Sequence, residues 1–333
     1  MAGPWVDDRP GHGFVQLSYA RYSADQYFAG PGENDGSVQQ LAVKPGSRRD
    51  ITIPTKSGFS TANIKSNYRD QAALLYGEVS LWRGLGFTFS MPLVRYVTQD
   101  IHTVVPAKLS QLNVGDATFG LKQQLPTIRA LRGFAFGPQL YFTAPTGDVN
   151  GRSAYPAAAM LGDTKPLPIP TGNGTFDIEA RASFGYSFYP VPVFLTADVG
   201  FRHRITKASC KSGTSESSTT YSDDLPWNVQ AGGTLAPKKK LSWFDHATLI
   251  ATVNGLHSFE NGDVPGKNGI AAKGNPFLDS CGQANNASSL SFGGTLLLFP
   301  VKWVGLSYSV SHTLTGTNVG YGLSNIVGLA TQF

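Results

Sequence analysis

The segment FDIEARASFGYSF, residues 176–188, alternates apolar and polar side chains from its first residue to its last. One face carries the apolar set Phe176, Ile178, Ala180, Ala182, Phe184, Tyr186 and Phe188. The other face carries Asp177, Glu179, Arg181, Ser183, Gly185 and Ser187. Because successive side chains of a strand point to opposite sides, this period of two predicts a β-strand with one apolar and one polar face.

The same alternation recurs along the whole chain and leaves no segment for helices that would cover the apolar faces. The polar faces carry small residues such as Gly305, Ser307 and Ser309, which suit a lumen better than a soluble core. The predicted fold class is therefore all-β, a transmembrane antiparallel β-barrel of about 12 strands. The expected strands are 13–28, 63–81, 86–97, 113–125, 133–145, 174–189, 192–206, 226–237, 246–260, 287–299, 303–315 and 320–333.

The composition agrees with this class of protein. Charged residues make up 15% of the 333 residues, against roughly 25% in soluble domains. The mean hydropathy is only −0.13, and the sequence holds no run of about 20 apolar residues that would form a spanning helix. The net charge of +5 comes without a basic, aromatic-rich patch for nucleic acid. No signal peptide is visible, so we expect the sequence to be a mature form.

The connections between the expected strands separate by length. Short turns, such as Trp82-Arg83-Gly84 and Val301-Lys302, alternate with long segments. Bacterial barrels have short periplasmic turns and long outer loops. We therefore predict one barrel domain over residues 1–333, with 1–12 as a short periplasmic segment. The predicted extracellular loops are 29–62, 146–173, 207–225 and 261–286.

Aromatic residues mark the chain terminus and the expected ends of the strands. Phe333 ends an apolar-alternating strand, which resembles the signal read by the barrel-assembly machinery, although Thr331 departs from the usual apolar residue. Tyr and Trp favour the membrane interfaces. The residues expected in these interfacial girdles are Tyr19, Tyr22, Trp82, Tyr186, Phe188, Trp227, Trp243 and Trp303.

Three short motifs resemble one family. The run 113–122, NVGDATFGLK, resembles a strand start "GDxxxGLK"; 145–148, PTGD, resembles a strand exit; and 172–177, GNGTFD, resembles the opening "GxGxxD" of the next strand. Together they are similar to the outer-membrane transporter family associated with the meta-cleavage pathway of phenol degradation, itself distantly similar to fatty-acid-type channels. The resemblance implies passive uptake of small, often aromatic or hydrophobic, compounds.

Charged side chains on the predicted inner faces are the candidate site. One interpretation is a constriction whose transverse field selects solutes. The other is a salt-bridge network that fills and stiffens a narrow barrel, since buried charges need partners. The sequence leaves both open, because about twelve strands lie between a filled barrel and a water channel. The predicted pore-lining residues are Glu78, Asp116, Lys122, Asp177, Glu179, Arg181, Asp198, Arg202 and Arg204.

Cysteine and histidine suggest little chemistry beyond this. Cys210 and Cys281, the two cysteines, both fall in predicted outer loops, where an oxidising compartment permits a disulfide between them. The pairs His257-Ser258 and Ser311-His312 are adjacent on strands, so their side chains point to opposite faces and cannot form a nucleophile–base contact. We predict no enzyme, metal site or cofactor.

The sequence thus predicts an outer-membrane channel for passive passage of small, perhaps aromatic or hydrophobic, solutes. The expected partners are the lipid bilayer, lipopolysaccharide, the barrel-assembly machinery and the solute, with other envelope proteins as a further option. The alternative is a structural barrel that anchors or docks a multiprotein cell-envelope complex, and a third hypothesis is a hydrolase at the rim.

Overall fold

The computed structural model of the chain contains nineteen β-strands and no helix among the residues it describes. Those residues are 6, 9–28, 44, 46–50, 52–57, 60–101, 107–125, 133–150, 152–153, 167–168, 170–212, 215–235, 245–259, 262 and 286–333. Within them, we find no helix with the length and apolarity needed to cross a membrane.

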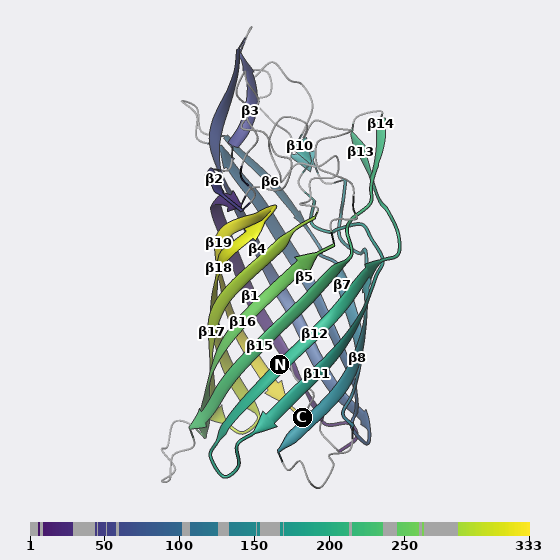
Figure 1. Cartoon of the computed structure of the whole chain (residues 1–333), viewed down its shortest axis with the longest axis vertical. Coiled ribbons are helices and arrows are strands. Elements are labelled where there is room, and N and C mark those ends of the chain that lie inside the picture. The colour runs from purple at the N-terminus through teal and green to yellow at the C-terminus, as the bar shows by residue number, and fades with distance from the viewer. Residues whose placement is uncertain are drawn as a thin grey trace.

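Twelve strands form a closed antiparallel barrel, which confirms the predicted fold class (Figure 1). β1 pairs with β4 on one side and with β19 on the other, so the first and last strands close the wall. The barrel strands are β1 (Gly13–Phe28), β4 (Ser60–Trp82), β5 (Leu85–Ile101), β7 (Ala117–Gln123), β8 (Phe134–Ala144), β11 (Asp177–Ser187), β12 (Val193–Arg204), β15 (Asp224–Leu235), β16 (His246–Ser258), β17 (Ser288–Val301), β18 (Val304–Thr317) and β19 (Val319–Gln332).

Seven shorter strands lie in the connections at one end of the barrel (Figure 1). They are β2 (Arg48–Asp50), β3 (Thr52–Ser57), β6 (Ala107–Asn113), β9 (Arg152–Ser153), β10 (Leu167–Pro168), β13 (Ala208–Ser212) and β14 (Ser215–Thr219). The predicted loops 29–62, 146–173 and 207–225 therefore contain strand pairs that the alternation did not reveal. We call this the loop end, and the opposite end, with the short turns, the turn end.

The largest differences from the predicted strand boundaries lie in β4 and β5, which extend beyond the other barrel strands at the loop end. β4 begins at Ser60 and β5 runs to Ile101, while β3 and β6 extend this sheet at the loop end. β6 and β7 both pair with β5, and residues 114–116 separate β6 from β7. A strand beyond the bilayer needs no apolar outer face, so its sequence lacks the alternation that identified the other strands.

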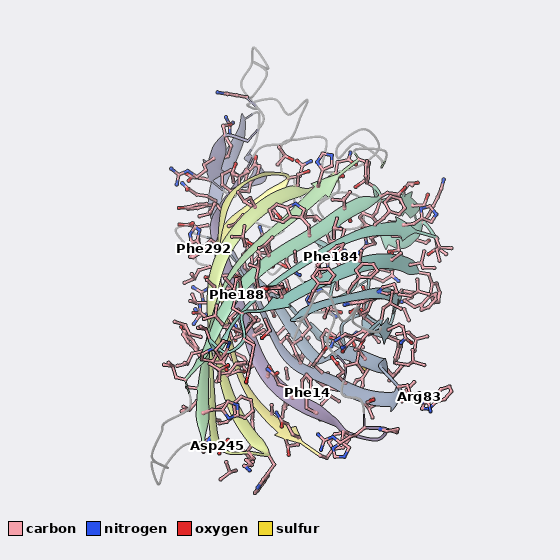
Figure 2. All side chains as sticks on the ribbon, turned by 60° about the horizontal axis from the view of Figure 1, so that its bottom comes forward. Phe14, Arg83, Phe184, Phe188, Asp245 and Phe292 are labelled. Atoms are coloured by element: carbon pink, nitrogen blue, oxygen red, sulfur yellow. The ribbon has the colours of Figure 1, made fainter. Side chains whose placement is uncertain are left out.

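The two faces of the wall differ as the alternation predicts. In β12, Leu195 and Val199 are each 42% exposed on the outer face, whereas Thr196 and Asp198 are 1% and 4% exposed on the inner face. Figure 2 shows the side chains standing on both sides of the ribbon. A closed barrel with an apolar outer surface and a polar interior satisfies all of its backbone groups inside lipid. Single-chain bacterial barrels of this kind lie in the outer membrane, and this is where the protein belongs.

Most of the predicted girdle residues lie at the ends of the outer face. Trp82, Tyr186 and Trp303 are exposed near the turn end. Tyr22 is different: its side chain packs against a buried cluster of Ala24 and Tyr27 inside the wall. The girdle prediction is wrong for Tyr22, because the even-numbered residues of β1 as far as Ala24 face inward while Tyr19 faces outward. Trp243 lies outside the described residues.

The described part of the predicted N-terminal segment lies at the turn end. The backbone N–H of Gly11 donates to the carbonyl of Ser80 at 2.8 Å, which extends the pairing of β1 with β4. Val6 is buried, and its N–H donates to Gln124 Oε1 at 2.8 Å.

Candidate functional site

Eight of the nine predicted pore-lining residues lie on the inner face of the barrel, on four of its strands. Cross-strand partners share a face, and the registers place these residues opposite one another and opposite other buried polar positions. The eight are Glu78 on β4, Lys122 on β7, Asp177, Glu179 and Arg181 on β11, and Asp198, Arg202 and Arg204 on β12.

Glu179 is the centre of one cluster. Its Oε2 accepts from Nε of Arg202 at 2.8 Å across the β11–β12 pair, and its Oε1 accepts from Nε of Arg181 on its own strand. The Glu179 side chain is 6% exposed, whereas both arginines are 27% exposed. The Arg181 guanidinium also lies over the ring of Tyr141, 4.9 Å from its centroid. One buried carboxylate therefore fixes two guanidiniums that reach the lumen.

Arg204 forms a second cluster closer to the loop end. Its Nη1 lies 2.9 Å from Asp177 Oδ2, and its Nη2 lies 2.8 Å from Asp224 Oδ2. Asp224 is the first residue of β15, so the sequence reading, which began this strand at residue 226, missed it. Pro226 interrupts the polar alternation between Asp224 and Asn228, and extending the strand by two residues would have found Asp224.

Glu78 and Lys122 form a third cluster, across a different part of the wall. Lys122 Nζ donates to both carboxylate oxygens of Glu78 at 3.0 Å, and Tyr76 donates to Oε2 at 3.2 Å. Lys122 is the more buried partner, with a side chain 4% exposed against 13% for Glu78.

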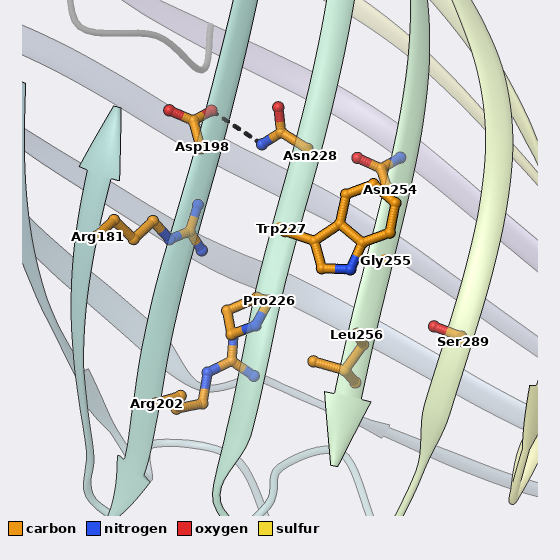
Figure 3. A pocket seen from close by; sticks show the side chains of 10 residues that line it. All are labelled: Arg181, Asp198, Arg202, Pro226, Trp227, Asn228, Asn254, Gly255, Leu256 and Ser289. Atoms are coloured by element: carbon orange, nitrogen blue, oxygen red, sulfur yellow. Dashed lines mark hydrogen bonds between the residues drawn. The ribbon is translucent and has the colours of Figure 1, made fainter. Parts of the chain in front are cut away.

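Asp198 has neutral partners. Asn228 on β15 donates to its Oδ2 at 2.9 Å (Figure 3). Ser183 donates to its Oδ1. Ser183 in turn accepts from Gln139. The chain of polar groups therefore continues around the wall from β8 to β15.

The opposite part of the wall, on β16 to β19, carries hydroxyl groups and glycines. Thr295 and Ser309 are hydrogen-bonded at 2.8 Å, and Gln16 Nε2 on β1 donates to Ser307 at 3.1 Å. The lumen is thus asymmetric, with ion pairs on one side and small neutral groups on the other.

Asp116, the ninth predicted pore-lining residue, binds the backbone of two connections. It lies in the break between β6 and β7, where its Oδ1 accepts from the Gly147 N–H at 2.9 Å and its Oδ2 from the Asn173 N–H at 2.6 Å. Both oxygens thus bind the backbone of two other connections and take no part in the inner ion pairs described above. We interpret Asp116 as the anchor of a loop cluster.

The three family-like motifs meet in this loop cluster, which consists of residues 113–118, 145–148 and 171–177. Thr146 donates to the Gly115 carbonyl at 2.6 Å and accepts from the Ala117 N–H at 3.0 Å. The N–H of Asp148 donates to Thr171 Oγ1 at 3.1 Å, and the N–H of Thr171 donates back to the Asp148 carbonyl at 2.8 Å. The three motifs, which are far apart in the sequence, therefore hold the same three connections together.

Close backbone contact explains the glycines of these motifs. A Cβ placed on Gly147 would lie 2.5 Å from the Cα of Gly172, a distance at which the two connections could not approach each other. Arg95 on β5 joins the cluster to the wall, because its Nη1 donates to the Thr171 carbonyl at 2.8 Å while its Nη2 pairs with Asp70 at 2.6 Å.

A cavity of about 290 Å³ opens beside the Glu179 cluster (Figure 3). Among its lining residues are Arg181, Asp198, Arg202, Asn228, Asn254 and Leu256.

The remaining candidates lie apart from this cavity or outside the described residues. His257 is exposed while Ser258 is buried and hydrogen-bonded to Ser222, as expected for adjacent residues on a strand. No group of three or more potential metal ligands occurs in the described part of the chain. Cys281 and the side chain of Cys210 lie outside the described residues, so their disulfide stays a prediction.

Comparison with solved structures supports the fold. The crystal structure of an outer membrane channel from Pseudomonas putida F1 is similar with a TM-score of 0.56 at 12% identity, over 98% of this chain and 96% of that chain. Two others are less similar. The toluene transporter TodX from Pseudomonas putida has a TM-score of 0.42 at 11% identity, over 97% of this chain and 90% of that chain. The translocator domain of the autotransporter NalP from Neisseria meningitidis has a TM-score of 0.47 at 11% identity, over 98% and 89%.

Searches with family models and among curated proteins find no match to this chain. The similarity therefore establishes the barrel fold of outer-membrane channels, and the phenol-degradation family suggested by the three motifs stays a prediction.

Proposed function

We propose that this barrel is a channel for the passive passage of small solutes across the outer membrane. The observation that carries the proposal is the polar, asymmetric inner face, on which paired charges oppose a wall of hydroxyl groups and glycines. A barrel that only anchors other proteins needs no such asymmetry. The shared fold with a protein named as an outer membrane channel supports the same function.

The proposed solutes are small, and aromatic or hydrophobic compounds are included among them. Aromatic side chains on the inner face support this choice: Tyr76 packs against Phe14 at 5.5 Å, and Tyr141 lies beneath Arg181. Aromatic rings offer such solutes apolar contact at fixed positions in an otherwise polar lumen. The proposed pore-lining set is the inner-face group of eight charged residues named above.

Conductance of the purified protein in planar bilayers tests the channel function. We expect discrete conductance steps for the wild type. The double variant Arg202→Ala/Arg204→Ala should become several-fold more cation-selective, because Asp177 and Asp224 lose Arg204 and Glu179 loses one of its two arginines. The reversal potential in a salt gradient measures this change.

Two controls make the conductance result decisive. Heat-modifiable gel migration shows that each barrel is folded, and Arg83→Asn, at an exposed turn, should leave the selectivity unchanged. A folded wild-type barrel without conductance would refute the channel, and the docking barrel would then be the better hypothesis. Unaltered selectivity in the double variant would remove those arginines from the pore lining.

We further propose that Cys210 and Cys281 form a disulfide that joins two extracellular loops at the pore mouth. Peptide mapping of the unreduced protein should then find one cross-linked pair of peptides that separates on reduction. Detection of both cysteines as alkylated free thiols, in protein isolated from the outer membrane without reductant, would contradict the disulfide.

The proposal also assigns an orientation and a set of partners. The chain forms one domain, with the turn end in the periplasm and the loop end facing lipopolysaccharide outside the cell. Phe333 serves as the signal for the barrel-assembly machinery. Other envelope proteins would dock on the loop end.

A further inference from the structure

The structure points to a binding site for a carboxylate group in the lumen, formed by Arg181 and Arg202; we propose that small monocarboxylates, aromatic ones included, are solutes of this channel. The inference rests on the proposed channel function, and it names the class of solute. Its basis is the way in which one glutamate holds two arginines beside a cavity.

Glu179 binds each of the two arginines through the Nε atom of that arginine. Each of its two oxygens accepts from one Nε, so the hydrogen bonds to Glu179 do not use the terminal Nη groups of Arg181 and Arg202. Among the described residues, the one further ion pair of these two guanidiniums is a long contact of 4.0 Å between Arg202 Nη1 and Asp224. Both guanidiniums therefore keep donors for another acceptor.

Both side chains line the cavity of about 290 Å³ (Figure 3). In this view Arg181 and Arg202 lie on the same side of the cavity, with Asn254 and Leu256 across from them. The volume is near the lower limit of ordinary ligand sites, which favours a small solute. Leu256 adds apolar lining, and the amides of Asn228 and Asn254 add polar groups.

The charges are layered in a way that favours an anion. The carboxylates of Glu179, Asp177 and Asp224 are only 4–6% exposed, while the arginines that cover them are 12–27% exposed. A solute in the lumen therefore meets guanidinium groups before it meets carboxylates. Asp198 also lines the cavity, but its two oxygens already accept from Ser183 and Asn228.

The arginines are also held in position before any solute arrives. Tyr141 lies against one face of the Arg181 guanidinium. Gly200 leaves the room that the Arg181 stem occupies, because a Cβ there would lie 2.8 Å from Arg181 Cγ. A fixed guanidinium loses less conformational freedom on binding, and its planar array of donors matches a carboxylate. Because Glu179 already compensates part of the charge, binding should be weak enough for release.

The test measures binding separately from transport. Benzoate is titrated into the folded protein in detergent and followed by saturation-transfer NMR, with benzyl alcohol as the neutral probe of similar size. We expect benzoate to bind and benzyl alcohol to bind much more weakly. In Arg181→Gln/Arg202→Gln, benzoate affinity should fall about tenfold or more, since two charge-assisted interactions are lost.

A matched control removes two arginines from the outer face. Arg21→Gln/Arg69→Gln lowers the net charge equally but leaves the lumen intact, so benzoate affinity should not change. Where the lumen double variant does not fold, the single variant Arg181→Gln replaces it and should still weaken binding several-fold.

Three results would overturn the carboxylate site. They are failure of benzoate to bind, equal binding of benzyl alcohol, and full benzoate affinity in the folded lumen variant. Failure of the channel itself is recognised independently, because a barrel that binds benzoate at these arginines but shows no conductance would refute the transport function and leave the site in place.

Discussion

The variant Glu179→Gln should unfold at a clearly lower denaturant concentration than the wild type, with a loss of about 2–3 kcal/mol in the free energy of unfolding. Removing one partner from a buried ion pair costs about 3–5 kcal/mol. The lower value is expected here because Arg181 and Arg202 remain 27% exposed and keep part of their hydration. Equilibrium unfolding in urea, from lipid vesicles, measures the change.

Glu179→Gln should change the ion selectivity in the opposite direction to the double variant Arg202→Ala/Arg204→Ala. Two guanidiniums lose their shared counter-ion, so the lumen becomes more positive and the channel more anion-selective. Glu179→Asp is the matched control, since it keeps the charge and should retain most of the selectivity. Wild-type stability together with wild-type selectivity in Glu179→Gln would show that the arginines do not depend on this carboxylate.

Asp116→Ala is expected to disconnect the loop cluster at a cost of about 2–4 kcal/mol. Its carboxylate accepts from the N–H groups of Gly147 and Asn173, at 2.9 Å and 2.6 Å. Hydrogen bonds to a charged group contribute about 1.5–3 kcal/mol each, and part of that is recovered where water replaces the carboxylate. Amide hydrogen exchange at Gly147 and Asn173 should accelerate far more than at the strands of the barrel.

Two comparisons separate this local effect from a general loss of folding. Asp116→Asn keeps an acceptor and should have a smaller effect, whereas Asp25→Ala changes an exposed residue of β1 and should have none. Equal acceleration of exchange across all strands would mean that Asp116 stabilises the whole barrel and not this cluster in particular.

The sequence was sufficient for the membrane-spanning part of the fold. In β11 and β12 the alternation separates Glu179 and Arg202 from Phe184 and Phe201, and the structure places these two pairs on opposite faces. Lipid imposes the rule on every spanning strand, so the pattern is repeated and hard to miss. Above the bilayer the rule no longer applies, and the strand pairs β3–β4 and β5–β6 left no such pattern.

The ion-pair partners of the charged residues could not be predicted from the sequence. Alternation assigns a side chain to a face, but the stagger between neighbouring strands decides which residues meet. Nothing in the run from Asp177 to Arg181 indicates that Glu179 would bind two arginines or that Arg204 would bridge Asp177 and Asp224. The contacts of Asp116 were hidden for the same reason, because they come from residues more than thirty positions away.

The seam between β1 and β19 has a consequence for the kinetics of assembly. Phe14 lies opposite Gln332, and the N–H groups of Gly13 and Phe333 donate to each other's carbonyl oxygens at 3.1 Å and 3.0 Å. These contacts have nearly the greatest sequence separation that the chain allows, so forming them is entropically costly and slow. Until they form, β1 and β19 are exposed edges that invite aggregation. A partner that covered either edge during assembly would therefore have to leave before the barrel could close.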